Sequence, residues 1–178
     1  MLKIFAVIGA VVAGGIAVVL ILAAMKPDTF RVQRSAAIKA PPEKIFPHLA
    51  DFHAWPSWSP WEKIDPALQR TYSGPNSGPG AVYEWSGNKN IGSGRMEILE
   101  AAPSSRVLIK LDFLSPFEAH NTAEFTLQPS GDGTTVTWAM YGPNTLMSKL
   151  MSLVFNMETM VGPQFETGLD NLKAVAER

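Results

Sequence analysis

The chain has 178 residues, a formal net charge of −1 and no cysteine. A near-neutral charge removes the electrostatic case for nucleic-acid binding, because no basic stripe is present to neutralise phosphates. The lack of cysteine excludes disulfides, thiolate-ligated zinc or iron–sulfur centres and a thiol nucleophile.

The N-terminal segment is an uncharged run of 22 residues from Ile4 to Met25, bounded by Lys3 and Lys26. As a helix it would be about 33 Å long, enough to cross a bilayer core. We therefore predict a transmembrane anchor over residues 1–26, a domain over residues 27–178 and a single-pass membrane protein. The competing interpretation is a cleaved signal peptide, although the run is longer than a usual signal-peptide core. The short N-terminus with an early lysine slightly favours a domain outside the cytoplasm, periplasmic or extracellular, over a cytoplasmic one.

The residues after this segment alternate between apolar and polar in short runs separated by turn signals, which is typical of an antiparallel meander. A short helix beginning near Pro41-Pro42 and an irregular aromatic segment from Trp55 to Trp61 separate the first run from the rest. The predicted strands are Phe30–Ile38, Leu68–Ser73, Ala81–Ser86, Ile91–Ala101, Arg106–Leu114, Glu118–Gln128 and Thr134–Tyr141.

The C-terminal segment changes to helical spacing, with apolar residues every three or four positions from Thr145 to the end. Asn144 is a plausible N-cap, and Gly162-Pro163 predicts a kink or brief break. A long amphipathic helix must bury its apolar stripe, and a curved antiparallel sheet offers a concave face for it. The sequence therefore predicts an α+β fold.

Several segments carry a family resemblance. They are residues 38–46 after the first strand, the tryptophan and proline segment 55–61, and residues 92–98, 133–138 and 168–173. In this order and spacing they resemble the START-like or SRPBCC superfamily, in its polyketide cyclase/dehydrase and lipid-transport branch. The resemblance implies a helix-grip fold, a sheet around the long C-terminal helix that encloses a cavity for lipids, polyketides or other hydrophobic ligands. The resemblance implies a ligand pocket but no particular reaction, because the family has no shared catalytic motif.

Strand alternation and helical spacing together nominate the residues of such a cavity. Most inward residues are simply core, but the methionines between positions 140 and 160 suit a surface that meets varied apolar ligands. The tryptophans of the 55–61 segment could form a lid over the cavity or a plug at one end. The predicted ligand-binding residues are Trp55, Trp58, Tyr83, Trp85, Met96, Ile98, Phe113, Asn121, Phe125, Trp138, Met140, Leu150, Val154 and Met157.

Polar candidates for chemistry are few. Asn121 and Arg34 lie on the inward phase of their strands, but neither belongs to a recognisable acid–base pair. The three histidines have no metal-ligand spacing, so we expect no metal, no cofactor and no assigned catalytic residue.

Three functions follow from these features. The first is a membrane-tethered binding or carrier domain for a hydrophobic small molecule or lipid. The second is an enzyme, a cyclase, dehydrase or hydrolase acting on a hydrophobic substrate, and the third is a non-catalytic protein-interaction module that uses the tryptophan segment. The sequence favours a binding protein over an enzyme and leaves the oligomeric state open.

Overall fold

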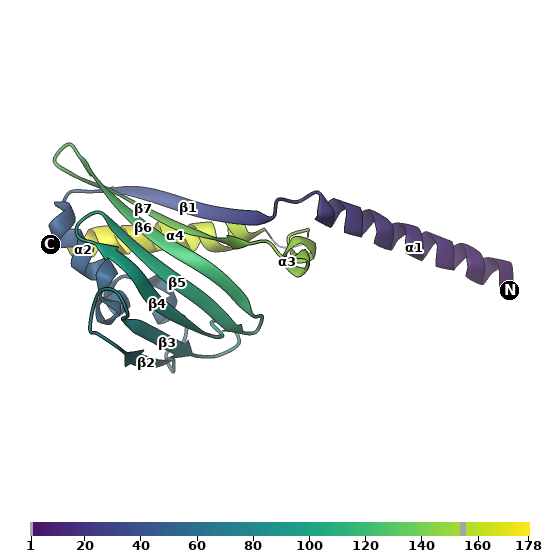
Figure 1. The fold of residues 1–178 in the computed structure, drawn as a ribbon, viewed down its shortest axis with the longest axis horizontal. Helices are drawn as coiled ribbons and strands as arrows, with labels where there is room; N and C mark the ends of the chain where they lie inside the picture. Colours follow the sequence, from purple (N-terminus) through teal and green to yellow (C-terminus); the bar gives the residue numbers. More distant parts are fainter. Residues whose placement is uncertain (1, 154–155) are drawn as a thin grey trace.

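The computed structural model describes residues 2–153 and 156–178. Figure 1 shows a curved sheet with helices on one side and one long N-terminal helix pointing away. The helices are α1 (Leu2–Ala24), α2 (Pro42–Ala50), the 3₁₀ turns η1 (Phe52–Ser57) and η2 (Pro60–Lys63), α3 (Leu146–Met151) and α4 (Met157–Ala176). The strands are β1 (Thr29–Ile38), β2 (Gln69–Ser73), β3 (Val82–Ser86), β4 (Ser93–Ala102), β5 (Arg106–Ser115), β6 (Ala119–Ser130) and β7 (Gly133–Pro143).

The strands form one antiparallel sheet in the order β1-β7-β6-β5-β4-β3-β2. Strands β2 to β7 follow one another as a meander, and β1 pairs with β7 from Thr29 opposite Pro143 to Ile38 opposite Thr134. Every predicted strand is present, with its ends within two residues of the predicted ones. The alternation was informative because one face of this sheet is buried along most of its length.

The C-terminal helix lies against that buried face, where α4 contacts β1, β7 and the two 3₁₀ turns. The antiparallel sheet and its C-terminal helix therefore confirm the predicted helix-grip arrangement. Four residues of α4 that are at most 2% exposed hold it there: Phe165, Leu169, Leu172 and Ala176.

The helical boundaries differ from the prediction. The C-terminal region forms two helices, α3 and α4, and α4 continues through Gly162 and Pro163, so the predicted break at this pair is wrong. Asn144 does not cap α3; its side-chain amide donates to the carbonyl oxygen of Pro27 at 3.0 Å. The caps are Thr145, which accepts from the Ser148 N–H, and Asn156, which accepts from the Glu158 N–H.

The N-terminal prediction also needs correction. Helix α1 extends away from the sheet, and at its C-terminal end Ala23 is buried, where the helix meets α3. Over the described parts of the chain, no helix combines the length and the apolar character that a bilayer crossing demands. The predicted transmembrane anchor and the single-pass topology are therefore wrong, and the predicted placement of the domain outside the cytoplasm loses its basis, because it depended on that anchor.

Candidate ligand-binding site

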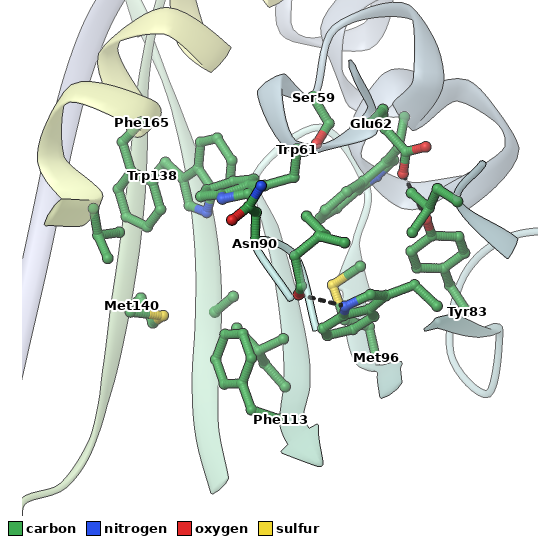
Figure 2. Close-up of a pocket in the computed structure, with 17 residues that line it drawn as sticks. Ser59, Trp61, Glu62, Tyr83, Asn90, Met96, Phe113, Trp138, Met140 and Phe165 are labelled. Carbon is green, nitrogen blue, oxygen red and sulfur yellow. Dashed lines mark hydrogen bonds between the residues drawn. The ribbon is translucent and has the colours of Figure 1, made fainter. Parts of the chain in front are cut away.

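A cavity of about 240 Å³ lies between the sheet, the N-terminal half of α4 and the segment around η1 and η2. Seven aromatic side chains contribute to its wall, and Figure 2 shows the labelled ones converging from these elements. The lining residues are Trp55, Ser59, Trp61, Glu62, Leu68, Tyr83, Trp85, Asn90, Ile91, Met96, Leu111, Phe113, Ala123, Trp138, Met140, Val161 and Phe165. The wall is thus almost entirely apolar, which suits an apolar ligand.

The sheet side of the wall follows from cross-strand register. Met96 of β4 lies opposite Tyr83 of β3 and Leu111 of β5, so three neighbouring strands point side chains to the same face. Farther along the sheet, Ala123 of β6 lies opposite Met140 of β7. Because alanine has no side chain beyond Cβ, Ala123 leaves space in the cavity that a larger side chain would occupy.

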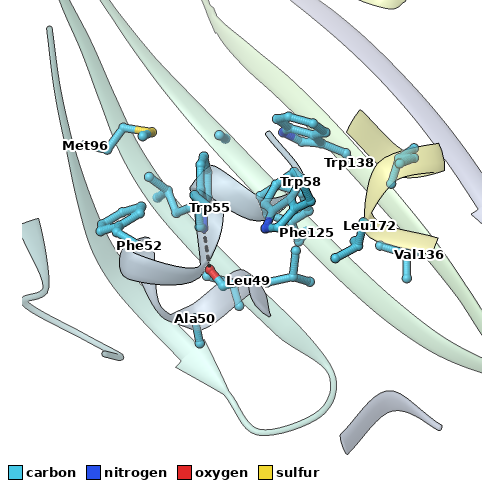
Figure 3. Packing of buried hydrophobic residues seen from close by; sticks show 14 of the residues in the cluster. Leu49, Ala50, Phe52, Trp55, Trp58, Met96, Phe125, Val136, Trp138 and Leu172 are labelled. Atoms are coloured by element: carbon cyan, nitrogen blue, oxygen red, sulfur yellow. Dashed lines mark hydrogen bonds between the residues drawn. The ribbon is translucent and has the colours of Figure 1, made fainter. Parts of the chain in front are cut away.

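The aromatic segment packs against the end of α2 and lines one side of the cavity. Trp55 and Trp58 are 4% and 0% exposed. Their indole N–H groups donate to backbone carbonyls at the end of α2, Trp55 to Leu49 at 3.3 Å and Trp58 to His48 at 3.0 Å. Figure 3 shows both rings seated among buried residues of α2, the sheet and α4. These bonds satisfy helix-terminal carbonyls and fix the irregular segment.

Trp61 occupies a different position from the other two tryptophans. It is partly buried and lines the cavity from η2. Its ring meets Trp138 edge to face, with ring centroids 5.3 Å apart, and Phe165 at 6.0 Å. Trp61 is therefore the tryptophan of this segment that borders both the cavity and the outside.

A charged group is built into the wall beside these rings. Tyr83 Oη donates to Glu62 Oε1 at 2.6 Å, and Arg70 Nε donates to Glu62 Oε2 at 2.5 Å. The Glu62 side chain is only 5% exposed, so Arg70 supplies the countercharge that makes its burial tolerable. Burial raises the pKa of Tyr83 far above its usual value, and the hydrogen bond to Glu62 raises it further. Tyr83 is therefore a neutral donor at physiological pH.

Half of the residues predicted to bind a ligand lie in the cavity wall, and their contact with a ligand stays a prediction. Those in the wall are Trp55, Tyr83, Trp85, Met96, Phe113, Trp138 and Met140. Outside the wall are Trp58, Ile98 and Phe125, which are completely buried in the core, and Asn121, Leu150 and Met157. Val154 lies outside the described residues.

The two polar candidates lie away from the cavity. Asn121 sits close to Gly142 on β7, where a Cβ would meet its Oδ1 atom. The guanidinium of Arg34 reaches α4 beside Gly162 and pairs with Glu158 and Glu166. Neither side chain lines the cavity.

Several wall residues were not among the predicted ones, because their positions depend on tertiary contacts. Glu62 stands in an irregular segment, and its partners Arg70 and Tyr83 are 8 and 21 residues away in sequence. Asn90 and Ile91 come from the β3–β4 connection. Leu111 and Ala123 share the inward phase of predicted wall residues, and Phe165 shares the helical stripe of α4, so periodicity alone could have included these three.

Other titratable clusters lie away from the cavity. On the opposite face of the sheet, Asp112 accepts a hydrogen bond from His120 Nδ1 at 2.8 Å and pairs with Lys110 at 2.9 Å. The hydrogen bond that His120 donates to Asp112 raises the pKa of this exposed histidine. Across residues 2–153 and 156–178, no group of three or more His, Asp and Glu side chains could hold a metal ion.

Solved structures share this fold at low sequence identity. Protein CV1439 from Chromobacterium violaceum is 18% identical over 86% of this chain and 99% of its own, with a TM-score of 0.59. A protein from Thermobifida fusca is 20% identical over 82% of this chain and 92% of its own, with a TM-score of 0.61. DynU16, a protein in the dynemicin biosynthetic locus, is 17% identical over 85% of this chain and 48% of its own, with a TM-score of 0.54.

The sequence comparisons agree with the fold. No curated protein matches the chain significantly. The profile of the family described as "Polyketide cyclase / dehydrase and lipid transport" matches residues 29–177, which spans the sheet, the cavity and α4. The chain therefore belongs to the polyketide cyclase/dehydrase and lipid-transport family.

Proposed function

We propose that this protein binds and carries a hydrophobic small molecule in the cavity between the sheet and α4. The observation that carries the proposal is the wall itself, in which seven aromatic rings and two methionines surround about 240 Å³ of space. An apolar cavity of about 150 Å³ is enough to bind benzene, so this one suits a compact ligand of two or three fused rings. Membership of a family described by polyketide cyclisation and lipid transport supports the same class of ligand.

The experiment is a titration of the full chain with N-phenyl-1-naphthylamine, an apolar dye whose fluorescence rises in a dry environment. We expect saturable binding by the wild type and its loss in Ala123→Leu, which puts a larger side chain into the cavity. Dye on exposed apolar surface, such as that of α1, would be unaffected by this substitution. Equal binding by both proteins would refute the proposal.

A second candidate is an enzyme acting on a hydrophobic substrate, and the observation that favours it is the Glu62–Tyr83 pair in the wall. A carboxylate and a neutral tyrosine at 2.6 Å could move or hold a proton on a bound substrate. The test is mass spectrometry of whatever apolar compound co-purifies, incubated with the wild type and with Glu62→Gln. Conversion by the wild type alone supports an enzyme; an unchanged compound in both favours a carrier.

The protein-interaction alternative loses its basis in the structure. An exposed patch of Trp55, Trp58 and Trp61 with no cavity behind it would have favoured this alternative. Trp55 and Trp58 are buried instead, and Trp61 borders a cavity.

A further inference from the structure

The indole N–H of Trp138 is an unpaired donor in the cavity wall. Trp138 is 3% exposed, and among the residues that the structure describes its Nε1 atom has no hydrogen-bond partner. The indoles of Trp55, Trp58 and Trp85 each donate to a backbone carbonyl. Buried side-chain donors nearly always have a hydrogen-bond partner. We therefore expect an acceptor for the Trp138 indole N–H that this structure does not contain.

The rings around Trp138 supply no oxygen. Phe165 stacks on one face at 4.2 Å, with the two planes 9° apart, and Phe125 lies at 4.9 Å. Trp58 and Trp61 meet Trp138 edge to face at 5.4 and 5.3 Å. A water molecule there would need two to four polar partners, and these four neighbours are all aromatic. Ser59, Glu62 and Asn90 also line the cavity, but none of them accepts a hydrogen bond from Nε1. A ligand oxygen is the acceptor that remains.

The chemistry of the wall limits what that ligand can be. Figure 2 shows Trp138 beside Phe165 in the wall, with Glu62 and Tyr83 on the other side of the view. Glu62 is the charged residue of the wall and its charge is negative, which disfavours a ligand anion. The aromatic lining favours a flat, largely aromatic body.

Building on the proposed function, we infer that the ligand is a neutral aromatic compound with a carbonyl oxygen, and that Trp138 selects it by donating its indole N–H to that oxygen. The competing arrangement is an N–H···π contact from Trp138 to Trp58 or Trp61, a weaker interaction that needs no ligand oxygen. Only the first arrangement requires a ligand with an oxygen that accepts a hydrogen bond. A buried donor without an acceptor discriminates strongly against an analogue that lacks the oxygen.

The experiment compares 1-tetralone with tetralin, which share a two-ring skeleton and differ in the carbonyl group. Calorimetric titration of the full chain gives the ratio of the two dissociation constants. In Trp138→Phe we expect the preference for the ketone, relative to the wild type, to fall about tenfold. Trp85→Phe is the matched control, because this indole also lines the cavity but already donates to Ile91. It should weaken both ligands together and leave the ratio unchanged.

A second measurement uses the wild type alone and does not depend on the stability of a variant. In nitrogen–proton NMR spectra, the assigned indole proton of Trp138 should shift downfield on addition of 1-tetralone and not on addition of tetralin. An unchanged affinity ratio in Trp138→Phe, or the same proton shift with both compounds, would overturn the inference while leaving apolar binding intact. Failure of both compounds to bind the wild type would instead refute the proposed function.

Discussion

Substituting Ala123 by leucine adds three carbon atoms to a wall residue that is 4% exposed and faces the cavity. Burying each added carbon is worth about 0.8 kcal/mol, or about 2.4 kcal/mol in all. Ordering the leucine side chain costs about 0.5–1 kcal/mol. Because the cavity offers space, no overpacking strain need be subtracted. We therefore expect the free energy of unfolding to rise by about 1.5 kcal/mol.

The assay is urea unfolding of the full chain, followed by fluorescence, alongside the dye titration. The matched control is Ala176→Leu, since Ala176 on α4 is 0% exposed and does not line the cavity. Extra carbons in a filled core force neighbours off their preferred positions, so this control should lose about 1–3 kcal/mol. A leucine at position 123 should thus stabilise the protein and abolish dye binding together.

A destabilised Ala123→Leu variant would refute the reasoning, because it would mean that the space beside Ala123 is already filled in solution. A stabilised variant that still binds the dye would place the dye elsewhere and separate the cavity from apolar binding.

Three further predictions concern charged groups. Arg70→Met leaves buried Glu62 without its countercharge and should lower the unfolding free energy by about 2–3 kcal/mol, part of which Glu62→Gln should restore in the double variant. The hydrogen bond that His120 donates to Asp112 raises the folded-state pKa of His120, so protonated His120 adds stability that is complete below about pH 6.5 and is lost as pH rises through the raised pKa. Unfolding midpoints measured between pH 5 and 8 should therefore depend less on pH in His120→Gln. Arg34→Met removes two half-exposed ion pairs to α4 and should cost at most about 1 kcal/mol in urea unfolding, whereas a larger loss would show that these pairs clamp the helix.

The sheet could be predicted from the sequence because its signal is local. Each strand buries one face, so residues such as Val107 and Ile109 repeat with a period of two and fix the direction of every neighbour. The same alternation predicts that Met96, Trp138 and Met140 point toward the interior.

Alternation could not separate the cavity wall from the core. Phe125 and Ile98 point to the same face as Met96, yet both are 0% exposed, and Phe125 packs against Trp55 and Trp58. The distinction depends on which element covers each stretch of the sheet. Part of this covering is the aromatic segment between α2 and β2. Its course cannot be predicted from the sequence, because the segment is irregular and has no hydrophobic periodicity.

The N-terminal prediction was wrong for a different reason. The absence of charges over a long run predicts a membrane span, but the described helices do not meet the combined requirement of length and apolar character. The sequence does not predict the buried Glu62 site, because a glutamate in a sequence gives no information about how deeply its side chain is buried. Only the approach of Arg70 and Tyr83 to Glu62 identifies it as a buried group.

The division of α4 into two unlike halves has a consequence for ligand exchange. Its C-terminal half is anchored by Leu169, Leu172 and Ala176, all at most 1% exposed, while its N-terminal half borders the cavity through Val161 and Phe165 and leaves Met160 59% exposed. Amide protons before Phe165 should therefore exchange with solvent through local openings that cost less free energy than global unfolding. Such fraying would uncover the cavity while the sheet and the far end of the helix stay folded. A ligand could then enter and leave many times during the lifetime of one folded molecule.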